Sequence, residues 1–263
     1  MKWTMWIAVL GIAGAMTGHA GEVHPACSGA EFRAFDFMHG VWRVTDQENR
    51  LWGYAQLEPA AGGCATLEHW YGARGGRGNG LVFYDATQKQ WQRVYVTAGF
   101  QELDFPGATV EGGIRFMGKF VEKGVETRVR VTYRKTPDGS VEITDESTTD
   151  GVNWKLESTK PHARAEKLPT PPAGPAIHPE CKAEAFRDFG RWASAWSSGL
   201  TADVVEQVKV ETKARGCLLM DVIRDAAGAE YLGFSFYDPA KQSWHRRAAG
   251  AGKVFRYDDP AKK

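Results

Sequence analysis

The fold is decided by residues 24–42, HPACSGAEFRAFDFMHGVW, because much of this stretch occurs again as HPECKAEAFRDFGRWASAW at residues 178–196. The two strings align without a gap. A match of this length indicates an internal repeat, which determines the architecture before any single element does. Identical residues occupy equivalent places at His24 and His178, Pro25 and Pro179, Cys27 and Cys181, Phe32 and Phe186, Arg33 and Arg187, Phe35 and Phe189, and Trp42 and Trp196.

The match continues beyond this stretch once the spacing between the copies shortens by one residue. It ends near Gly252, the partner of Gly99. The chain is therefore one module followed by a shortened second copy. The later pairs are Glu58 and Glu211, Gly63-Cys64 and Gly216-Cys217, Gly80 and Gly233, Phe83-Tyr84-Asp85 and Phe236-Tyr237-Asp238, Trp91 and Trp244, and Arg93 and Arg246.

The composition is that of a globular protein without a strong charge bias. The chain has 263 residues, of which 43% are hydrophobic, enough for one or two buried cores. Lysine and arginine total 33 against 32 aspartate and glutamate. Because basic residues exceed acidic ones by only one, we expect neither a nucleic acid nor an acidic membrane surface as a partner.

Residues 1–20 have the pattern of a secretory signal peptide. Lys2 is followed by an apolar run over residues 6–16 and then by small residues up to Ala20, after which cleavage is expected, with Ala15 as a second option. The alternative is a membrane anchor, but about 20 apolar residues are needed to span a bilayer and this run is shorter. We therefore expect a periplasmic or secreted protein without a membrane span.

The four cysteines occupy equivalent places in the two copies. Of the three possible pairings, the repeat favours Cys27–Cys64 and Cys181–Cys217, because a bond inside the ancestral unit is inherited by both copies. Export would bring these cysteines into the oxidising conditions that disulfides need. A zinc site is the alternative, although the close paired spacing of structural zinc sites is missing; its ligands would be His24, Cys27, His178 and Cys181. No metal site or cofactor is predicted.

Short strand-like runs with hardly a helical period dominate the first module. Turn residues such as Pro137-Asp138-Gly139 and Asp150-Gly151 separate them. This pattern predicts an all-β fold, with an antiparallel barrel of about ten strands over residues 21–160. The expected strands are 42–45, 51–58, 65–71, 81–84, 91–97, 114–121, 127–134, 141–147 and 154–158.

Residues 161–180 are rich in proline and are interpreted as a semi-extended linker. Residues 181–263 then form the truncated second copy, a half barrel with counterparts of the first five strands. Half a barrel leaves two strand edges without backbone partners. We expect it either to pack on the first module or to pair with a second chain in a symmetric homodimer.

An ordered series of motifs gives the first module a family resemblance. They are Phe35-Asp36-Phe37, Gly40-Val41-Trp42, Gly63-Cys64, Leu67-Glu68-His69-Trp70, Phe83-Tyr84-Asp85 with Trp91, and Thr149-Asp150-Gly151 with Trp154. Together they resemble a family of uncharacterised exported bacterial lipocalin-like proteins, distantly similar in fold to the haem-binding nitrobindins. The second copy departs from the pattern where Ser194 replaces Gly40 and Arg191 replaces Phe37. The resemblance implies a barrel with a cavity, in which Trp42 fills the closed end.

Alternation along the strands suggests which side chains face the interior together. Trp91, Arg93 and Tyr95, for example, share one face of their strand. An interior with aromatic walls and a few charged groups suits a ligand site; its predicted residues are Glu68, Trp70, Trp91, Arg93, Tyr95, Arg130 and Glu146. The alternative is that the charged members, Arg130 above all, lie on the outer face while the valines point inward.

Other patterns carry less information. His69 lies within a predicted strand of the first module and could bind a haem, or lie in the core or at the surface. The last predicted strand carries no histidine, which argues against haem binding of the nitrobindin kind. The glycine-rich residues 72–80 lack the Lys-Ser/Thr of a phosphate loop and are interpreted as a variable hairpin tip or a pocket rim.

Three functions fit these features. The first is an exported protein, without catalytic activity, that binds a small, partly apolar ligand in the first barrel. The second is an isomerase or cyclase in which Glu68 or Glu146 moves a proton while Arg93 and Tyr95 stabilise an oxyanion. The third is a structural or assembly protein of the cell envelope.

Overall fold

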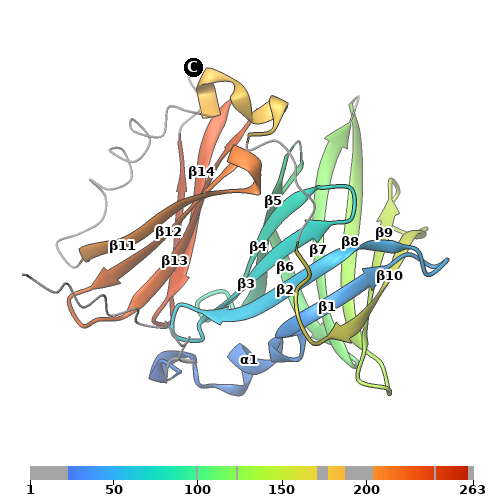
Figure 1. Cartoon of the computed structure of the whole chain (residues 1–263), viewed down its shortest axis with the longest axis horizontal. Helices are drawn as coiled ribbons and strands as arrows, with labels where there is room; N and C mark the ends of the chain where they lie inside the picture. The colour runs from blue at the N-terminus through green and yellow to red at the C-terminus, as the bar shows by residue number, and fades with distance from the viewer. Residues whose placement is uncertain are drawn as a thin grey trace, which may run out of the picture.

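The computed structural model describes residues 23–98, 100–122, 124–170, 177–186, 204–239 and 241–259. The predicted signal peptide, the middle of the proline-rich linker and the counterpart of Trp42 at Trp196 lie outside these residues. Within them, no helix is long and apolar enough to cross a membrane. The chain forms two β-sheets (Figure 1). One hydrophobic core lies between them, and a second lies inside the barrel.

The first ten strands form a closed antiparallel barrel, which confirms the predicted fold class. Each strand pairs with its neighbours in the sequence, and the first pairs with the tenth to close the barrel. The strands are β1 (Gly40–Thr45), β2 (Leu51–Ala60), β3 (Ala65–Gly72), β4 (Arg77–Asp85), β5 (Gln90–Thr97), β6 (Phe100–Val110), β7 (Gly113–Glu122), β8 (Val125–Lys135), β9 (Val141–Thr148) and β10 (Lys155–Ala165).

Strand β6 is the one element of the barrel that the sequence pattern does not predict. Pro106 and Gly107 interrupt its run, and Asp104 adopts a positive φ of 51°. The strand nevertheless pairs with β5, with a register shift between Arg93 and Tyr95 that accommodates the irregular backbone. Its residues therefore belong to the barrel wall rather than to a loop.

Short helical turns before β1 close one end of the barrel, on the side labelled α1 in Figure 1. Phe35 and Met38 from this lead-in pack with Trp42, and all three are at most 1% exposed. The indole Nε1 of Trp42 donates to the Met38 carbonyl at 2.7 Å, and the Arg164 guanidinium lies 3.8 Å from the ring centroid. Trp42 thus fills the closed end. The turns are η1 (Pro25–Cys27), α1 (Ala30–Arg33) and η2 (Asp36–Met38).

The second copy forms a separate five-stranded antiparallel sheet, the predicted truncated repeat. By sequence its strands correspond to β2–β6, so it extends one strand beyond the predicted end of the match, while the counterpart of β1 lies in residues that are not described. Its elements are η3 (Pro179–Lys182), η4 (Glu184–Phe186), β11 (Val204–Lys213), η5 (Ala214–Gly216), β12 (Leu218–Asp225), β13 (Glu230–Asp238), β14 (Ser243–Gly250) and β15 (Lys253–Asp258).

A disulfide-bonded clip has the same construction in both copies. The bonds Cys27–Cys64 and Cys181–Cys217 are both present, as predicted. In each copy the histidine that precedes the first cysteine donates its backbone N–H, at 2.8 Å, to the loop before the second cysteine, and its Nδ1 accepts from the backbone N–H two residues on. The loop carbonyls that accept are those of Gly62, from His24, and of Arg215, from His178. The repeat therefore extends to the backbone hydrogen bonds.

The variant Cys27→Ala/Cys64→Ala is expected to lose about 3–4 kcal/mol of the free energy of unfolding, because the bond closes a loop of 37 residues that would otherwise be free in the unfolded chain. Urea denaturation of the variant and the parent measures the loss. Cys181→Ala/Cys217→Ala, which opens a loop of 36 residues, is the matched comparison. If the free energy of unfolding falls by less than about 1 kcal/mol, removing the bond gives the unfolded chain little additional conformational freedom.

The half barrel packs through one face on the outside of the barrel, over β3, β4 and β5. Of the two predicted arrangements, the structure thus shows the one within the chain. The core between them is built from equivalent residues of the two copies, so the interface has an approximate twofold relation. The equivalent pairs are Ala65 and Leu218, Leu67 and Met220, Leu81 and Phe234, Phe83 and Phe236, and Val96 and Ala249.

Arginines of the half barrel fix its orientation on the barrel. Arg247, which is 2% exposed, donates from Nε and Nη2 to the carboxylate of Asp104 at 2.6–2.8 Å. Arg256 donates from Nη2 to Asp85 at 2.9 Å. Such charge-assisted bonds at the edge of an apolar contact set its register more than its strength.

Candidate functional site

Five of the seven predicted site residues face the barrel interior. Trp91 belongs to the barrel core and Trp70 packs against it. A Cβ built on Gly80 of β4 would lie 2.7 Å from the Glu68 carboxylate and 3.3 Å from the Tyr95 ring, so both side chains lie over this glycine on the inner face. The interior residues are Glu68, Trp70, Trp91, Arg93 and Tyr95.

The prediction that Arg130 and Glu146 face the interior is wrong. Val131 and Tyr133, which alternate with Arg130 on β8, belong to the barrel core, so Arg130 points outward. There Nε and Nη2 of Arg130 donate to the two carboxylate oxygens of Glu146, each at 2.6 Å, and the Trp154 ring lies 4.2 Å from the guanidinium. The pair is satisfied at the surface, while Val131 and Tyr133 take the inner positions of this strand.

Glu68 and Arg93 form a buried charged pair halfway along the barrel. Their side chains are 11% and 7% exposed, and Arg93 Nη2 lies 3.9 Å from Glu68 Oε2, too far for a hydrogen bond. The Arg93 guanidinium also lies over the rings of Tyr95 and Tyr133, at 4.7 and 5.8 Å. Burial raises the pKa of Glu68, an effect that Arg93 opposes. Burial also raises the pKa of Tyr95 and Tyr133, which keeps both phenols neutral.

The carboxylate of Glu68 is incompletely satisfied. Its Oε2 is buried and has no hydrogen-bond partner among the described residues. A buried polar atom in this state costs about 1–3 kcal/mol, so folds rarely retain one without a reason. This oxygen is available to a hydrogen-bond donor that enters the barrel.

The second copy contains the same pair in a closed form. Asp221 and Arg246, at the positions equivalent to Glu68 and Arg93, are 1% and 4% exposed. Arg246 donates to both oxygens of Asp221, the Nη2–Oδ2 bond being 2.7 Å, and to Ser235 Oγ at 3.2 Å. The Asp221–Arg246 pair is thus joined by hydrogen bonds, which is typical of a structural pair. The Glu68–Arg93 pair is not, and it is the candidate binding pair.

Sequence reasoning missed a second charged pair in the interior. Asp145 alternates with Ile143 of the core and so faces inward, and it accepts from Lys160 and Ser158 of β10. The side chains of Asp145 and Lys160 are 27% and 29% exposed, so solvent reaches this pair. A register shift between Leu156 and Ser158 in β10 conceals from the sequence that Ser158 and Lys160 face inward.

Glycines leave room for the aromatic side chains above the charged layer. A Cβ on Gly53 would lie 2.7 Å from the Trp70 ring, and one on Gly78 would lie 2.6 Å from the Tyr95 hydroxyl. Trp70 and Tyr95 are both half-buried. The site therefore has a charged floor, aromatic walls and, below it, the packed core at the closed end.

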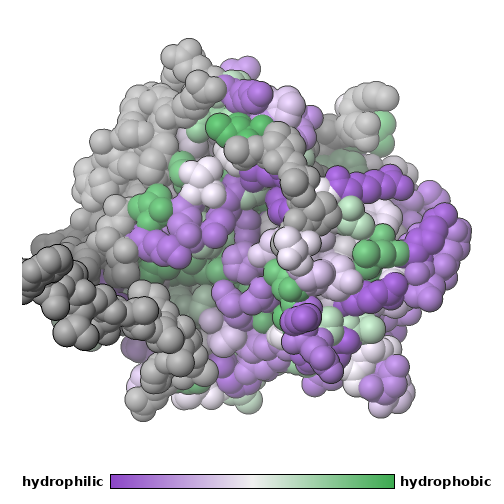
Figure 2. Space-filling model, in the orientation of Figure 1, coloured by the Kyte–Doolittle hydropathy of each residue, from purple (hydrophilic) through white to green (hydrophobic). Residues whose placement is uncertain are grey.

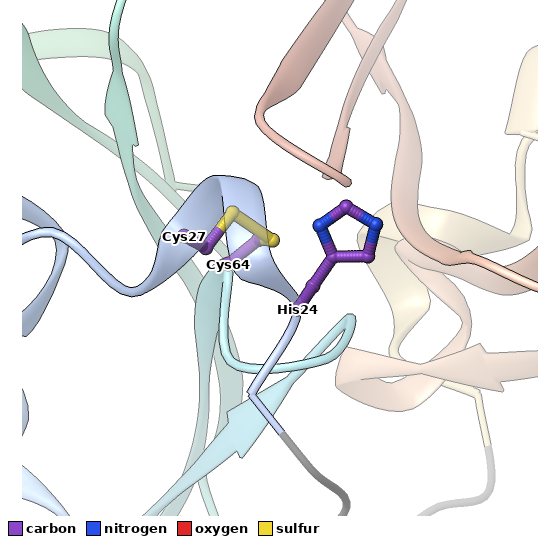
Figure 3. Close-up of side chains that lie close together, drawn as sticks. All are labelled: His24, Cys27 and Cys64. Carbon is purple, nitrogen blue, oxygen red and sulfur yellow. A yellow bond between two sulfur atoms is a disulfide. The ribbon is translucent and has the colours of Figure 1, made fainter.

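One cluster of the described residues has the spacing of metal ligands. His24, Cys27 and Cys64 place a ring nitrogen and two sulfurs within 4.8 Å of one another (Figure 3). The sulfurs are joined in a disulfide, so neither is the thiolate that binds a metal. The cluster is therefore part of the clip, and the predicted zinc alternative, which needs Cys27 and Cys181 as ligands, meets the same obstacle in both copies.

Two histidines of the barrel lie on opposite sides of its wall. His69 points outward, where its Nδ1 lies 2.8 Å from the Asn79 amide and its Nε2 lies 3.6 Å from Glu58. Strand β10 is longer than predicted and does carry a histidine, His162, which is 4% exposed at the closed end beside Trp42. Burial lowers the pKa of His162 to about 4, so this imidazole is neutral.

No protein-family model matches the chain, and no curated protein shows significant similarity to it. The fold and the site thus define a class on physical grounds. The chain is an all-β protein with a closed ten-stranded barrel and a second, five-stranded sheet packed on the barrel's outside.

Proposed function

We propose that the chain is an exported, lipocalin-like protein that binds a small, partly apolar ligand inside the first barrel. The observation that carries this proposal is the buried Glu68 Oε2, which lacks a hydrogen-bond partner beside Arg93 whereas the equivalent pair in the second copy is closed. The two disulfides support export, because such bonds persist in oxidising compartments.

The charges of the interior indicate the chemistry of the ligand's polar group. Glu68 is balanced by Arg93, and Asp145 by Lys160, so a charged group would enter without compensation at high cost. A neutral group that both donates and accepts, such as an alcohol or a primary amide, can donate to Glu68 and accept from the cationic or phenolic groups. Its apolar part would contact Trp70 and Tyr95.

Glu68→Gln is expected to weaken the binding of 1-octanol about tenfold, because an acceptor that carries a charge is replaced by a neutral one. Isothermal titration calorimetry on the full-length protein measures this. Glu146→Gln removes the same charge from the outer face and should leave the affinity within about twofold. If the parent takes up no 1-octanol, or if Glu68→Gln binds as the parent does, this proposal is abandoned.

Proton transfer is the second candidate function, and one observation favours it: burial raises the pKa of Glu68 next to Arg93 and Tyr95. A carboxyl group tuned in this way can act as a general acid or base. Glu146 has no part in this candidate, because it lies outside the barrel with Arg130. Turnover of a bound ketone that survives Glu68→Gln would rule the mechanism out.

A further inference from the structure

A cleft of about 330 Å³ lies between the barrel and the half barrel, apart from the interior site. Its floor is apolar and its rim is charged. In Figure 2 apolar surface is visible behind hydrophilic side chains where the two parts meet. The floor is formed by Leu67, Met220, Val222 and Leu232 together with Ala60 and Ala61, and the rim by Glu58, His69, Lys209, Glu211, Lys213 and Glu230.

The cleft joins equivalent regions of the two copies. Leu67 faces it from the barrel and Met220, its counterpart, from the half barrel. Glu58 of β2 and its counterpart Glu211 of β11 are both on the rim. The approximate twofold relation of the interface therefore brings two equivalent carboxylates to one cavity, and their surroundings can be compared directly.

The carboxylate of the half barrel is already neutralised by ammonium groups. Lys209 Nζ lies 3.0 Å from Glu211 Oε1, and Lys213 Nζ lies 3.1 Å from Oε2. At the equivalent positions of the first copy the chain has Gln56 and Ala60. No ammonium group is therefore supplied to Glu58 from its own strand.

Glu58 is instead held by neutral or weakly basic groups. Gln56 Nε2 donates to its Oε2 at 3.3 Å, and His69 Nε2 lies 3.6 Å from Oε1. The contact with His69 lowers the pKa of Glu58, and the charge of Lys213 across the cleft adds to the effect. The carboxylate is thus ionised at neutral pH, and with 46% of its side chain exposed it can accept further hydrogen bonds from a ligand.

We propose that this cleft binds a primary amine with a short apolar chain. The ammonium group donates to Glu58, in the role that Lys209 plays at Glu211, and the chain lies on the floor formed by Leu67, Met220 and Val222. A volume of about 330 Å³ is at the lower end of the range for small-molecule sites, which limits the ligand to a small amine. A carboxylate of the same length would meet Glu58, while the lysines of the rim are already paired with Glu211, so its binding is disfavoured.

Titration of the full-length protein with n-octylamine and with sodium octanoate, by isothermal titration calorimetry at neutral pH, tests the proposal. Octylamine should bind at least about fivefold more tightly than octanoate. Glu58→Gln should weaken octylamine about fivefold, because the charge-assisted bond is lost. Glu126→Gln removes the same charge from an exposed position on β8 and should leave the affinity within about twofold.

A second variant gives strand β2 of the barrel the lysine that strand β11 of the half barrel has at the equivalent position. Gln56→Lys places a lysine where Lys209 stands in the second copy, and its ammonium group is expected to occupy Glu58 and prevent octylamine binding. Because Gln56 is half-buried at the surface, the fold should tolerate it. Equal binding of octanoate, or octylamine affinity unchanged in both Glu58→Gln and Gln56→Lys, would overturn the proposal.

The interior site provides an independent check. Octylamine binding should survive Glu68→Gln, and binding of 1-octanol should survive Glu58→Gln. Loss of octylamine binding in Glu68→Gln but not in Glu58→Gln would place the amine in the barrel and refute the cleft site. Failure of 1-octanol to bind would affect the proposed function alone.

Discussion

Arg246→Met in the full-length protein is expected to lower the free energy of unfolding by about 3–5 kcal/mol, because it leaves the carboxylate of Asp221 buried without its partner. Asp221 is 1% exposed, so water cannot take the place of the guanidinium. Ser235 Oγ, which accepts from Arg246 Nη1 at 3.2 Å, loses that donor as well. Urea denaturation followed by circular dichroism measures the loss.

The variant Asp221→Leu/Arg246→Met separates the cost of an unpaired charge from the worth of the pair. Replacing both members of a buried pair by apolar residues of similar volume is often neutral or stabilising. We therefore expect the double variant to recover most of the stability lost by Arg246→Met. If Arg246→Met costs less than about 1 kcal/mol, the pair is not desolvated and its role as a structural lock is wrong.

The equivalent pairs show how two copies of a repeat can differ in side-chain contacts while the backbone is kept. Asp221 is one methylene shorter than Glu68, and Ser235 supplies a hydroxyl where the first copy has Val82. In the half barrel these side chains lock Arg246 in place. In the barrel, Tyr95 and Tyr133 approach Arg93 instead, and Glu68 Oε2 has no hydrogen-bond partner among the described residues.

The repeat explains why so much of the fold could be predicted from the sequence. Equivalent cysteines allowed the disulfides to be paired, and a series of short strands with turn residues between them predicted the barrel and the truncated sheet. Parity along β3 and β5 placed Glu68, Arg93 and Tyr95 inside. Each of these inferences depends on a local sequence pattern or on the repeat itself. None of them requires knowledge of the tertiary contacts.

Tertiary contacts decide the parts that sequence reasoning missed. Both faces of β8 carry residues that suit an interior, and only the packing of Val131 and Tyr133 against Phe35 shows which face is inside. Strand β6 follows an irregular course that pairing with β5 imposes. The inward positions of Ser158 and Lys160, which donate to Asp145, depend on a register shift in β10 that no spacing reveals.

The docking of the half barrel was left open by the sequence for a related reason. Strands β3–β5 bury side chains on both faces, because one face lines the barrel and the other is covered by the second sheet. From the sequence, such strands cannot be distinguished from those of a dimer interface. The same contact creates the cleft with Glu58 and Glu211, so that site could not be predicted before the contact was known.

Trp42→Ala is expected to cost about 3–5 kcal/mol of the free energy of unfolding, the range for a fully buried large aromatic side chain. Trp42 is 0% exposed and lies between the helical lead-in and the barrel core. Its loss also removes the hydrogen bond to the Met38 carbonyl and the contact with Arg164, so the lead-in that carries Cys27 is held by fewer contacts.

Trp52→Ala is the matched control: Trp52 is 52% exposed, and its loss should change stability by no more than about 0.5 kcal/mol. Urea denaturation of both variants checks the contrast, and equal stability of the two would show that the closed end of the barrel does not depend on the tryptophan.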